Sequence, residues 1–444
     1  MNLREIPYKG DAFELYLSLR RPGIPSVLLE SVQNFGKAGR YSIIAVNPSR
    51  IVRSSTDSPD PFLETRRILQ AKYSQPVPGA PPFLGGAIGF MSYETNRRIE
   101  PTLRAPEKDF LGLPDVYWLF FDEGVVLDHW MNKAVIFGKM KFRPIKRKII
   151  PRYRELPKNI ECLPGREQFM KNVKKAKDYI RKGDIFQANL SQCFRFPQKE
   201  DALSTYAKLR KVNPSPYFGF LDAGDFQILS GSPERLLKLE EGTLETRPIA
   251  GTRPRGKSAR EDLKLASELI LNEKERAEHV MLVDLERNDL GRVARYGSVS
   301  VDEFMVLEDY SHVKHIVSNV RGVLRDGLDA VDALKSFFPG GTITGTPKVR
   351  SMEIIAELEK TARGAYTGSL GYLAYNGNMD FNILIRSFVI KSGMAHVQVG
   401  AGIVADSDPK KEYDETLHKA KALFSAVFGE KRAGELCRRL GLTG

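Results

Sequence analysis

Tight turns between short strand-like segments recur along this chain and limit the folds open to it. "SVLLESV", "RYSIIAV" and "VYWLFF" are β-like, and "FLGGAIGFMSYE" is typical of a glycine-punctuated strand pair. Later, "YNGN" and "KSG" each predict a turn between paired strands. Helical segments lie among these strands without a regular strand–helix alternation. The sequence therefore predicts an α+β fold, with a large mixed or antiparallel β-sheet sandwich at its core and helices around it.

The composition changes twice along the chain, which predicts three regions of one compact fold. Residues 1–145 form an amino-terminal subdomain, residues 146–164 a basic connection that contains prolines, and residues 165–430 the main domain. Within the main domain, apolar periodicity and breakers predict helices over 167–182, over 259–290, after Pro347 and over about 409–429.

The formal net charge of +13 is concentrated in one segment. Residues 133–182 contain 17 lysines and arginines against 4 acids, and the other residues balance at 51 against 51. Aromatic residues are not interleaved with these charges, as a base-stacking surface would require. We therefore interpret the segment as a solvated connection and helix face and expect no nucleic-acid partner; a docking surface for an acidic partner stays open.

The chain is expected to be cytoplasmic and without a membrane association. Its start, "MNLREIPYKG", lacks the apolar core of a signal peptide, and no apolar run approaches the roughly 18 residues of a membrane span. Cys162, Cys193 and Cys437 show neither metal-ligand spacing nor a disulfide framework.

Two acid pairs lie on predicted helices of this otherwise basic chain. Glu275 and Glu278 in "NEKERAEH", and Glu412 and Glu415 in "KEYDETLHK", each place two carboxylates one turn apart on one face. A solvated helix face explains either pair alone, but Glu278 adjoins an apolar run. Close carboxylates repel unless a cation or proton intervenes. If the pairs converge, their all-oxygen donor set favours Mg²⁺ over zinc.

Polar residues also alternate with apolar ones in "DIFQANLSQ". Phe186, Ala188 and Leu190 share one side of the predicted strand, and Gln187 and Asn189 lie on the other. A strand between the core and a polar cavity would have this pattern.

Three other polar groups each have an ordinary structural explanation as well. Glu234 in "SPERLLKL" begins a strand, from which it can enter a cavity or simply be exposed. The amides of the Gly251-Thr252 turn could hold an oxyanion, as could many turns. His315 in "YSHVKHIVS" is ordinarily a satisfied core or surface histidine. No Ser/His/Asp grouping or G-x-S-x-G elbow supports nucleophilic hydrolysis.

The segment "FPGGTITGTPKVR" nearly has the pattern of a phosphate-binding loop. Gly340 and Gly345 have the required spacing, but Thr346 stands where a lysine is needed, so a P-loop is not expected. Thr346 as N-cap and Pro347 as the first helical residue predict a helix start. Its free N–H groups could hold a carboxylate, or the segment is only a glycine-rich turn.

Taken together, ordered motifs of the chain resemble one family. They are "GDIFQANLSQ", "GSPERLL", "RPIAGTR", "AEHVMLVDLERNDLGRV", "SHVKHIVS", "FPGGTITGTPKVRSMEII", "GYLAYNGNMDFNILIRS" and "GAGIVADSDPKKEYDET", and the amino-terminal region adds "LLES", "GRYS" and "GGAIGFMSYE". The chain resembles the chorismate-utilising enzymes, which include the large subunits of anthranilate and aminodeoxychorismate synthases and the water-adding isochorismate and salicylate synthases. The resemblance implies that residues 165–430 form a chorismate-binding catalytic domain.

The resemblance also implies roles for individual residues. Glu278 and Glu415 match direct Mg²⁺ ligands, and Glu275 and Glu412 match supporting acids. Positions that match the binding of chorismate are Gly251, Thr252, Thr342, Tyr366, Arg386, Gly400, Ala401, Gly402, Lys419 and Asn189.

The implied chemistry is amination. Glu234 matches the general acid that protonates the departing 4-hydroxyl of chorismate, and its pKa would need raising. Gln187 replaces the basic lysine of the water-adding relatives, which indicates ammonia as the nucleophile, and His315 matches a histidine beside the ring. No glutaminase module is recognisable in the sequence, so the resemblance implies a separate glutamine amidotransferase subunit as partner.

The position of amination follows from smaller differences. Asn189, Gly341 and "MDFNILIRS" resemble the branch that aminates carbon 4, the aminodeoxychorismate synthases. Ala250, where some members of that branch have a nucleophilic lysine, resembles the anthranilate synthases, which stay an alternative. An inactive regulatory paralogue is a further alternative, disfavoured because every metal and acid position is filled.

Four residues, Ser31, Pro216, Tyr217 and Phe218, resemble the tryptophan-feedback pocket of the family. Phe218 replaces the usual methionine, so weak or no inhibition by tryptophan is expected.

Overall fold

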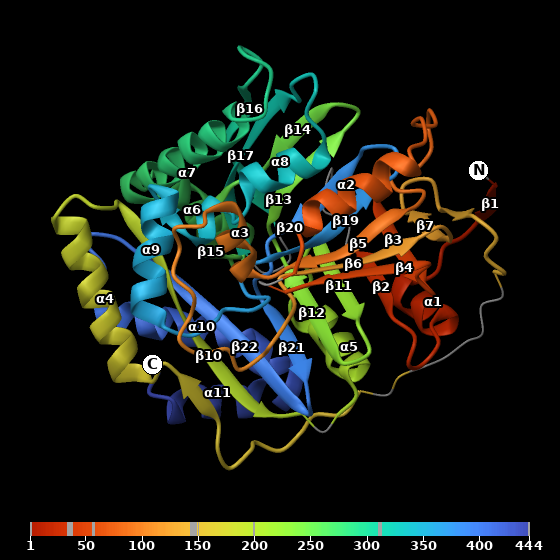
Figure 1. Ribbon diagram of the computed structural model, residues 1–444. Helices are drawn as coiled ribbons and strands as arrows, with labels where there is room; N and C mark the ends of the chain where they lie inside the picture. Colours follow the sequence, from red (N-terminus) through yellow and green to blue (C-terminus); the bar gives the residue numbers. More distant parts are fainter. Residues whose placement is uncertain are drawn as a thin grey trace.

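The computed structural model describes residues 2–32, 39–55, 58–142, 149, 151–198, 200–309 and 313–442. In this part of the chain, two large antiparallel sheets form the core, with helices around them (Figure 1). The predicted α+β sandwich is confirmed. Residues 146–148 and 150 of the predicted basic connection lie outside the described residues, as do residues 143–145 just before it. No helix within the described ranges is both long and apolar enough to span a bilayer.

The larger sheet has twelve strands in the described part of the chain. Their order is β1 (Leu3–Pro7), β8 (Lys133–Phe137), β7 (Gly124–Asp128), β3 (Tyr41–Val46), β2 (Ser26–Glu30), β11 (Tyr217–Asp222), β12 (Phe226–Ser232), β21 (Ser387–Lys391), β22 (Met394–Ile403), β10 (Gln187–Pro197) and β18 (Gly345–Thr346), with β9 (Glu161–Leu163) also paired to β10. The "KSG" turn joins β21 to β22, as predicted, because Ser392 and Gly393 both adopt positive φ.

The smaller sheet has ten strands among the described residues. Their order is β15 (Ile249–Pro254), β17 (Val313–Val323), β14 (Thr243–Thr246), β13 (Arg235–Glu240), β20 (Met379–Asn382), β19 (Ser369–Ala374), β5 (Gly86–Met91), β6 (Val116–Phe121) and β4 (Arg50–Ser54), with β16 (Ser300–Asp309) also paired to β17. The "YNGN" turn joins β19 to β20, and Gly377 there has a φ of 85°.

Both sheets run across the predicted border between the amino-terminal and main regions. β2 pairs with β11 in the larger sheet, and β5 pairs with β19 in the smaller sheet. The proposed division into 1–145, 146–164 and 165–430 stays a prediction.

Strand alternation explains how the layers pack. In β2, Val27 faces a buried cluster between the sheets, and Leu28 faces the helices on the far side of the larger sheet. In β5, Ile88 joins the same central cluster, whereas Ala87 faces the helices that cover the smaller sheet. Two-residue periodicity therefore supplies one apolar layer between the sheets and one outside each sheet.

The helices cover the outer faces of the sheets. They are α1 (Ala12–Leu19), α2 (Pro61–Ala71), α3 (Asn96–Ile99), α4 (Arg166–Arg181), α5 (Ala202–Val212), α6 (Ala259–Leu271), α7 (Glu273–Gly291), α8 (Ala330–Phe337), α9 (Lys348–Glu359), α10 (Pro409–Phe428) and α11 (Glu430–Arg439), with short 3-10 turns η1 (Tyr93–Thr95) and η2 (Gly341–Ile343). α4 and α9 lie against β10 and α10 lies against β22, while α6 and α7 lie beside β15 and β17 (Figure 1).

Three local expectations are corrected by the structure. The predicted helix 259–290 is two helices, because Asn272 has extended backbone and its Oδ1 accepts from Glu275 N at 3.0 Å, capping α7. Pro347, not Thr346, is the N-cap of α9, since Thr346 is held in β18 by its pairing with Gln187. Phe186 does not face the core and is 68% exposed, because β10 begins only at Gln187.

Candidate functional site

Glu234 lies where the chain leaves the larger sheet at the end of β12 and enters the smaller sheet at β13. Its backbone is fixed on both sides: Glu234 N donates to Ser232 Oγ at 3.2 Å, and Glu234 O accepts from Ile383 N at 3.0 Å. This crossing between layers buries the side chain, which is 7% exposed. A carboxyl group at an ordinary strand end would be solvated, so the burial of Glu234 comes from its position between the two sheets.

Burial raises the pKa of the Glu234 carboxyl to about 7, and three neighbours partly oppose the rise. They are the hydroxyl of Thr342 and the positive charges of Arg386 and Lys419. The structure therefore brings one predicted acid and three predicted substrate-binding residues together, from the β12–β13 connection, η2, the residue before β21 and α10. At neutral pH such a carboxyl can hold or release a proton.

The cations are themselves positioned by the backbone. Lys419 Nζ donates to Gly400 O at 2.9 Å and forms an ion pair with Glu415 Oε1 at 2.7 Å. Arg386 has a φ of 51°, and its Nη1 donates to Asn213 Oδ1 at 3.3 Å. Both positive charges act on the Glu234 carboxyl, so an anionic group bound beside it would also be attracted.

A glycine-rich stretch of β22 forms one wall of the same region. Gly402 pairs with Asn189 across the β10–β22 ladder. A Cβ on Gly400 would lie 2.6 Å from Tyr366 Oη and 3.2 Å from Asn189 Nδ2, and a Cβ on Gly402 would clash with Gln187 Nε2. Glycine thus lets these three side chains approach the strand closely, and the predicted residues Gln187, Asn189, Tyr366 and Gly400–Gly402 lie together.

His315 is held beside the Gly251 turn. A register shift between Ala250 and Thr252 in the β15–β17 ladder leaves Gly251 with a φ of 64°, and its carbonyl lies 3.1 Å from His315 Nδ1. Because a carbonyl only accepts, Nδ1 carries the proton. Burial lowers the pKa of His315 to about 4, so the ring is neutral at physiological pH. The side chain of Thr252 lies outside the described part of the structure.

The two acid pairs face each other from α7 and α10. The pKa of Glu278 is raised by burial and also by the charges of Glu275 and Glu415; the pKa of Glu412 is raised by burial and also by Glu415. Glu275 Oε1 forms an ion pair with Arg253 at 2.9 Å. These mutually repelling carboxylates form the oxygen-only donor set that Mg²⁺ prefers, and the residues fit the ion in chemistry.

The side chains of the four acids are too far apart in this structure to coordinate one metal ion together. No group of three or more His, Cys, Asp or Glu side chains within the described ranges is close enough to hold a metal ion. Two of the four acids, Glu275 and Glu415, are neutralised instead by Arg253 and Lys419.

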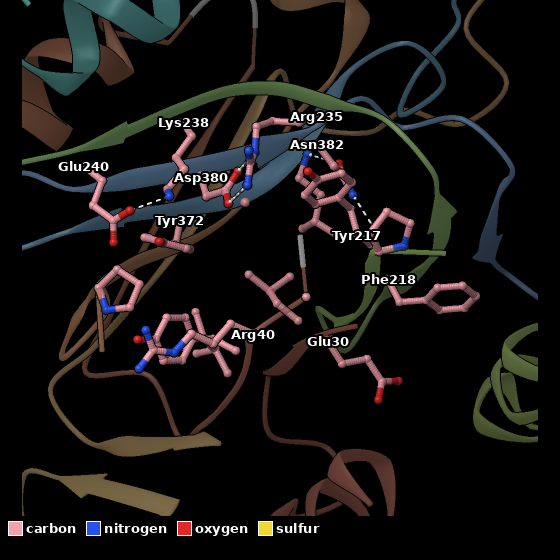
Figure 2. Close-up of a pocket in the computed structure, with 18 of the residues that line it drawn as sticks. Glu30, Arg40, Tyr217, Phe218, Arg235, Lys238, Glu240, Tyr372, Asp380 and Asn382 are labelled. Atoms are coloured by element: carbon pink, nitrogen blue, oxygen red, sulfur yellow. Dashed lines mark hydrogen bonds and ion pairs between the residues drawn. The ribbon is translucent and has the colours of Figure 1, made fainter. Parts of the chain in front are cut away.

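The predicted tryptophan-like pocket is divided between two cavities. Pro216, Tyr217 and Phe218 line a cavity of about 270 Å³ between the sheets, whereas Ser31 lines a neighbouring cavity of about 280 Å³. In the first cavity, Arg235 pairs with Asp380 above the Tyr217 ring (Figure 2). The sensitivity to tryptophan stays a prediction.

The sequence did not predict the buried ion pair of Arg363 with Glu359, which lies beside Asn189. Their spacing of four residues is the pattern of a helical ion pair and was readable in "EKTAR". The pattern gave no sign that the pair is buried, because both residues look like those of a solvated helix end.

The chain is similar to several proteins of known activity. A sequence profile described as chorismate binding enzyme matches residues 25–425. Aminodeoxychorismate synthase component 1 of Bacillus subtilis is 45% identical over 457 residues, which cover 96% of each chain. Anthranilate synthase component 1 of Thermus thermophilus is 44% identical over 436 residues, 93% of this chain and 94% of the relative. The crystal structure of anthranilate synthase component I from Streptococcus pneumoniae has a TM-score of 0.77 at 36% identity, covering 87% of this chain and 92% of that one.

Proposed function

Because the chain belongs to the family of chorismate-binding enzymes, we propose that it aminates chorismate with ammonia to 4-amino-4-deoxychorismate, as the first component of an aminodeoxychorismate synthase. The placement of Glu234 carries the proposal: it is a buried, protonatable carboxyl beside two cations, Arg386 and Lys419. These groups suit a substrate that bears carboxylates and a hydroxyl that leaves only when protonated.

The side chains around Glu234 supply binding. Arg386, Lys419 and the Tyr366 hydroxyl offer donors for the substrate's carboxylates. The absence of side chains at Gly400 and Gly402 lets the polar ends of Tyr366, Asn189 and Gln187 lie close to β22. Glu278 and Glu415, supported by Glu275 and Glu412, would hold Mg²⁺, which would withdraw electron density from the diene through the ring carboxylate.

Glu234 then drives departure of the hydroxyl. Its carboxyl gives a proton to the 4-oxygen, which leaves as water while the C–O bond breaks. Ammonia supplies the electron pair of the new C–N bond and afterwards loses one proton, which restores the neutral acid in the overall balance. Neutral His315 orients the ring without serving as an acid, because its pKa lies near 4.

Gln187 explains the choice of nucleophile. Its amide has no basicity, so it cannot deprotonate a water molecule, whereas ammonia already carries a free electron pair. We propose that a separate glutamine amidotransferase subunit delivers this ammonia. The name "component 1" of the Bacillus relative agrees with a second subunit.

Amination at carbon 4 is supported by Asn189, which places a polar amide beside Gly400 and Tyr366, and by the name of the Bacillus relative. The alternative is anthranilate formation, with amination at carbon 2 and loss of pyruvate. Ala250 favours it, since this residue stands beside the Gly251 turn where some carbon-4 enzymes have lysine, and the Thermus relative is nearly as similar.

The product decides between them. The purified chain, given chorismate, Mg²⁺ and an ammonium salt, should form 4-amino-4-deoxychorismate, which added aminodeoxychorismate lyase converts to 4-aminobenzoate. Without the lyase, little fluorescent aromatic product should appear, and denaturing mass spectrometry should show no adduct at Ala250. Anthranilate as the main product would establish the alternative; no consumption of chorismate would favour an inactive paralogue.

A further inference from the structure

We propose that Arg363 is a positioning residue for chorismate, which sets the Tyr366 hydroxyl and the wall of β10 at Asn189 in their binding geometry. The inference rests on the proposed chorismate site. It assigns a role to a residue that is not itself one of the proposed binding cations, metal ligands or proton donors. Arg363 is 1% exposed and lies in the turn between α9 and β19, three residues before Tyr366.

All five N–H donors of the Arg363 guanidinium have an acceptor. Nε and Nη2 donate to the two carboxylate oxygens of Glu359 at 2.8 and 2.7 Å. Nη2 also donates to Asn189 O at 2.6 Å, and Nη1 donates to Ile343 O at 3.3 Å and to Thr367 Oγ1 at 3.2 Å. This saturation fixes the guanidinium in one orientation, which the planar fork of arginine allows and the single ammonium of lysine does not.

The acceptors belong to the segments that carry the proposed substrate-binding residues. Asn189 is one of these residues, Ile343 follows Thr342, and Thr367 follows Tyr366. Thr367 Oγ1 connects Arg363 to the backbone of Tyr366, because it also donates to Tyr366 O at 2.6 Å. One guanidinium therefore ties β10, η2 and the Tyr366 turn together.

Glu359 extends this link along β10. Its Oε1 accepts from Ser191 N at 2.7 Å and from Ser191 Oγ at 3.0 Å. Ser191 pairs with Gly400 in the β10–β22 ladder, so the ion pair also fixes the strand that faces the glycine wall.

Aromatic rings and a second carboxylate hold the turn itself. The guanidinium carbon lies 4.7 Å from the centre of the Tyr93 ring and 5.7 Å from that of Tyr366. Glu94 accepts from Arg363 N at 2.8 Å and from Gly364 N at 3.0 Å. The amino-terminal region, which supplies Tyr93 and Glu94, thus helps to shape the substrate site.

The stability of the fold alone does not explain why Arg363 and Glu359 form a buried ion pair. Removing two charges from water costs free energy that their attraction often fails to recover, and apolar packing commonly stabilises a core as well. The ion pair instead fixes geometry, because its directional hydrogen bonds set the distances among β10, η2 and the Tyr366 turn. Misplacement of binding groups by about 1 Å can lower a rate ~10²-fold.

Arg363→Lys tests the role, because lysine keeps the charge and loses the fork. The folded variant should bind chorismate ~10–100-fold more weakly in equilibrium dialysis, with a matching fall in kcat/KM. Arg20→Lys is the control: Arg20 is a partly buried arginine, paired with Asp222 at 3.0 Å where β11 ends, outside the proposed site. It should lose stability without losing chorismate affinity.

A double-mutant cycle separates positioning from mere folding support. In a Tyr366→Phe background the hydroxyl to be positioned is gone, so Arg363→Lys should weaken chorismate binding much less than in wild type. A purely structural role predicts instead that the two effects on stability add and that the folded Arg363→Lys protein binds chorismate normally; that result would overturn the proposal.

Thr367 provides a milder test if Arg363→Lys does not fold. Thr367→Ala removes the link between Arg363 and Tyr366 O and should weaken chorismate binding several-fold, whereas Thr367→Ser, which keeps the hydroxyl, should restore it. Equal affinity in both Thr367 variants would contradict the proposal. These measurements score binding and not product, so anthranilate formation by the wild type would refute the proposed function and leave the test of Arg363 intact.

Discussion

Replacing Glu234 with glutamine should abolish most catalysis and at the same time stabilise the folded protein at alkaline pH. Burial raises the pKa of this carboxyl from 4.5 to about 7 in the folded state. An acid with a raised pKa keeps its proton in the fold while the unfolded chain ionises. Its contribution to stability is therefore complete below pH 4.5 and is lost as pH rises towards 7.

The size of the effect follows from the same pKa. One pKa unit corresponds to about 1.4 kcal/mol, so the ionisation of Glu234 lowers the free energy of unfolding by up to ~3 kcal/mol at pH 8. Glutamine has the same shape and does not titrate. Glu234→Gln should therefore be up to ~3 kcal/mol more stable than wild type at pH 8, while turnover falls ~10²–10⁴-fold because no proton reaches the departing hydroxyl.

Urea unfolding at pH 5 and pH 8, together with chorismate consumption in ammonium, measures both effects. Glu286→Gln is the control for the stability effect, since Glu286 is another buried acid of raised pKa and accepts from the Thr246 hydroxyl at 3.0 Å. It should also gain stability at pH 8. If Glu234→Gln is less stable than wild type at pH 8, or if only its KM changes, the reasoning about burial and acid catalysis is refuted.

Three further outcomes are expected. Glu278→Gln and Glu415→Gln should each abolish Mg²⁺-dependent turnover in a folded protein, and near-normal activity at low Mg²⁺ would contradict their assignment as ligands. Gly400→Ala should destabilise the fold by ~1–3 kcal/mol and raise the KM for chorismate, since the methyl group would press on Tyr366 Oη; unfolding and steady-state assays check this. His315, whose pKa burial lowers to about 4, should show no NMR titration between pH 5.5 and 8, and a transition near pH 6.5 would contradict its neutral role.

Local sequence patterns predicted much of the secondary structure. Helix α4 at Arg166–Arg181 and helix α10 at Pro409–Phe428 agree with the ranges 167–182 and 409–429. Both hairpin turns are where their glycines indicated. The break at Asn272 was missed, although an asparagine followed three residues later by Glu275 is a sequence pattern of a helix start. The structure shows the extended backbone of Asn272 and its capping bond with Glu275 N.

Residue types and spacing also selected candidate site residues. The structure brings Glu234, Thr342, Arg386 and Lys419 together, and the two glutamate pairs interact across α7 and α10. Motif order identified the family, which the comparisons show. The separate roles of these site residues in substrate binding, acid catalysis and metal ligation are still predictions.

The sequence by itself determined which residues can form strands, turns and helices, because those preferences act over a few neighbouring residues. Only the tertiary structure decided what surrounds each side chain. The crossing from one sheet to the other buries Glu234 and raises its pKa, and the meeting of four distant segments makes Arg363 a buried centre of hydrogen bonds. Desolvation and electric fields depend on groups far apart in sequence, so no local pattern contains them.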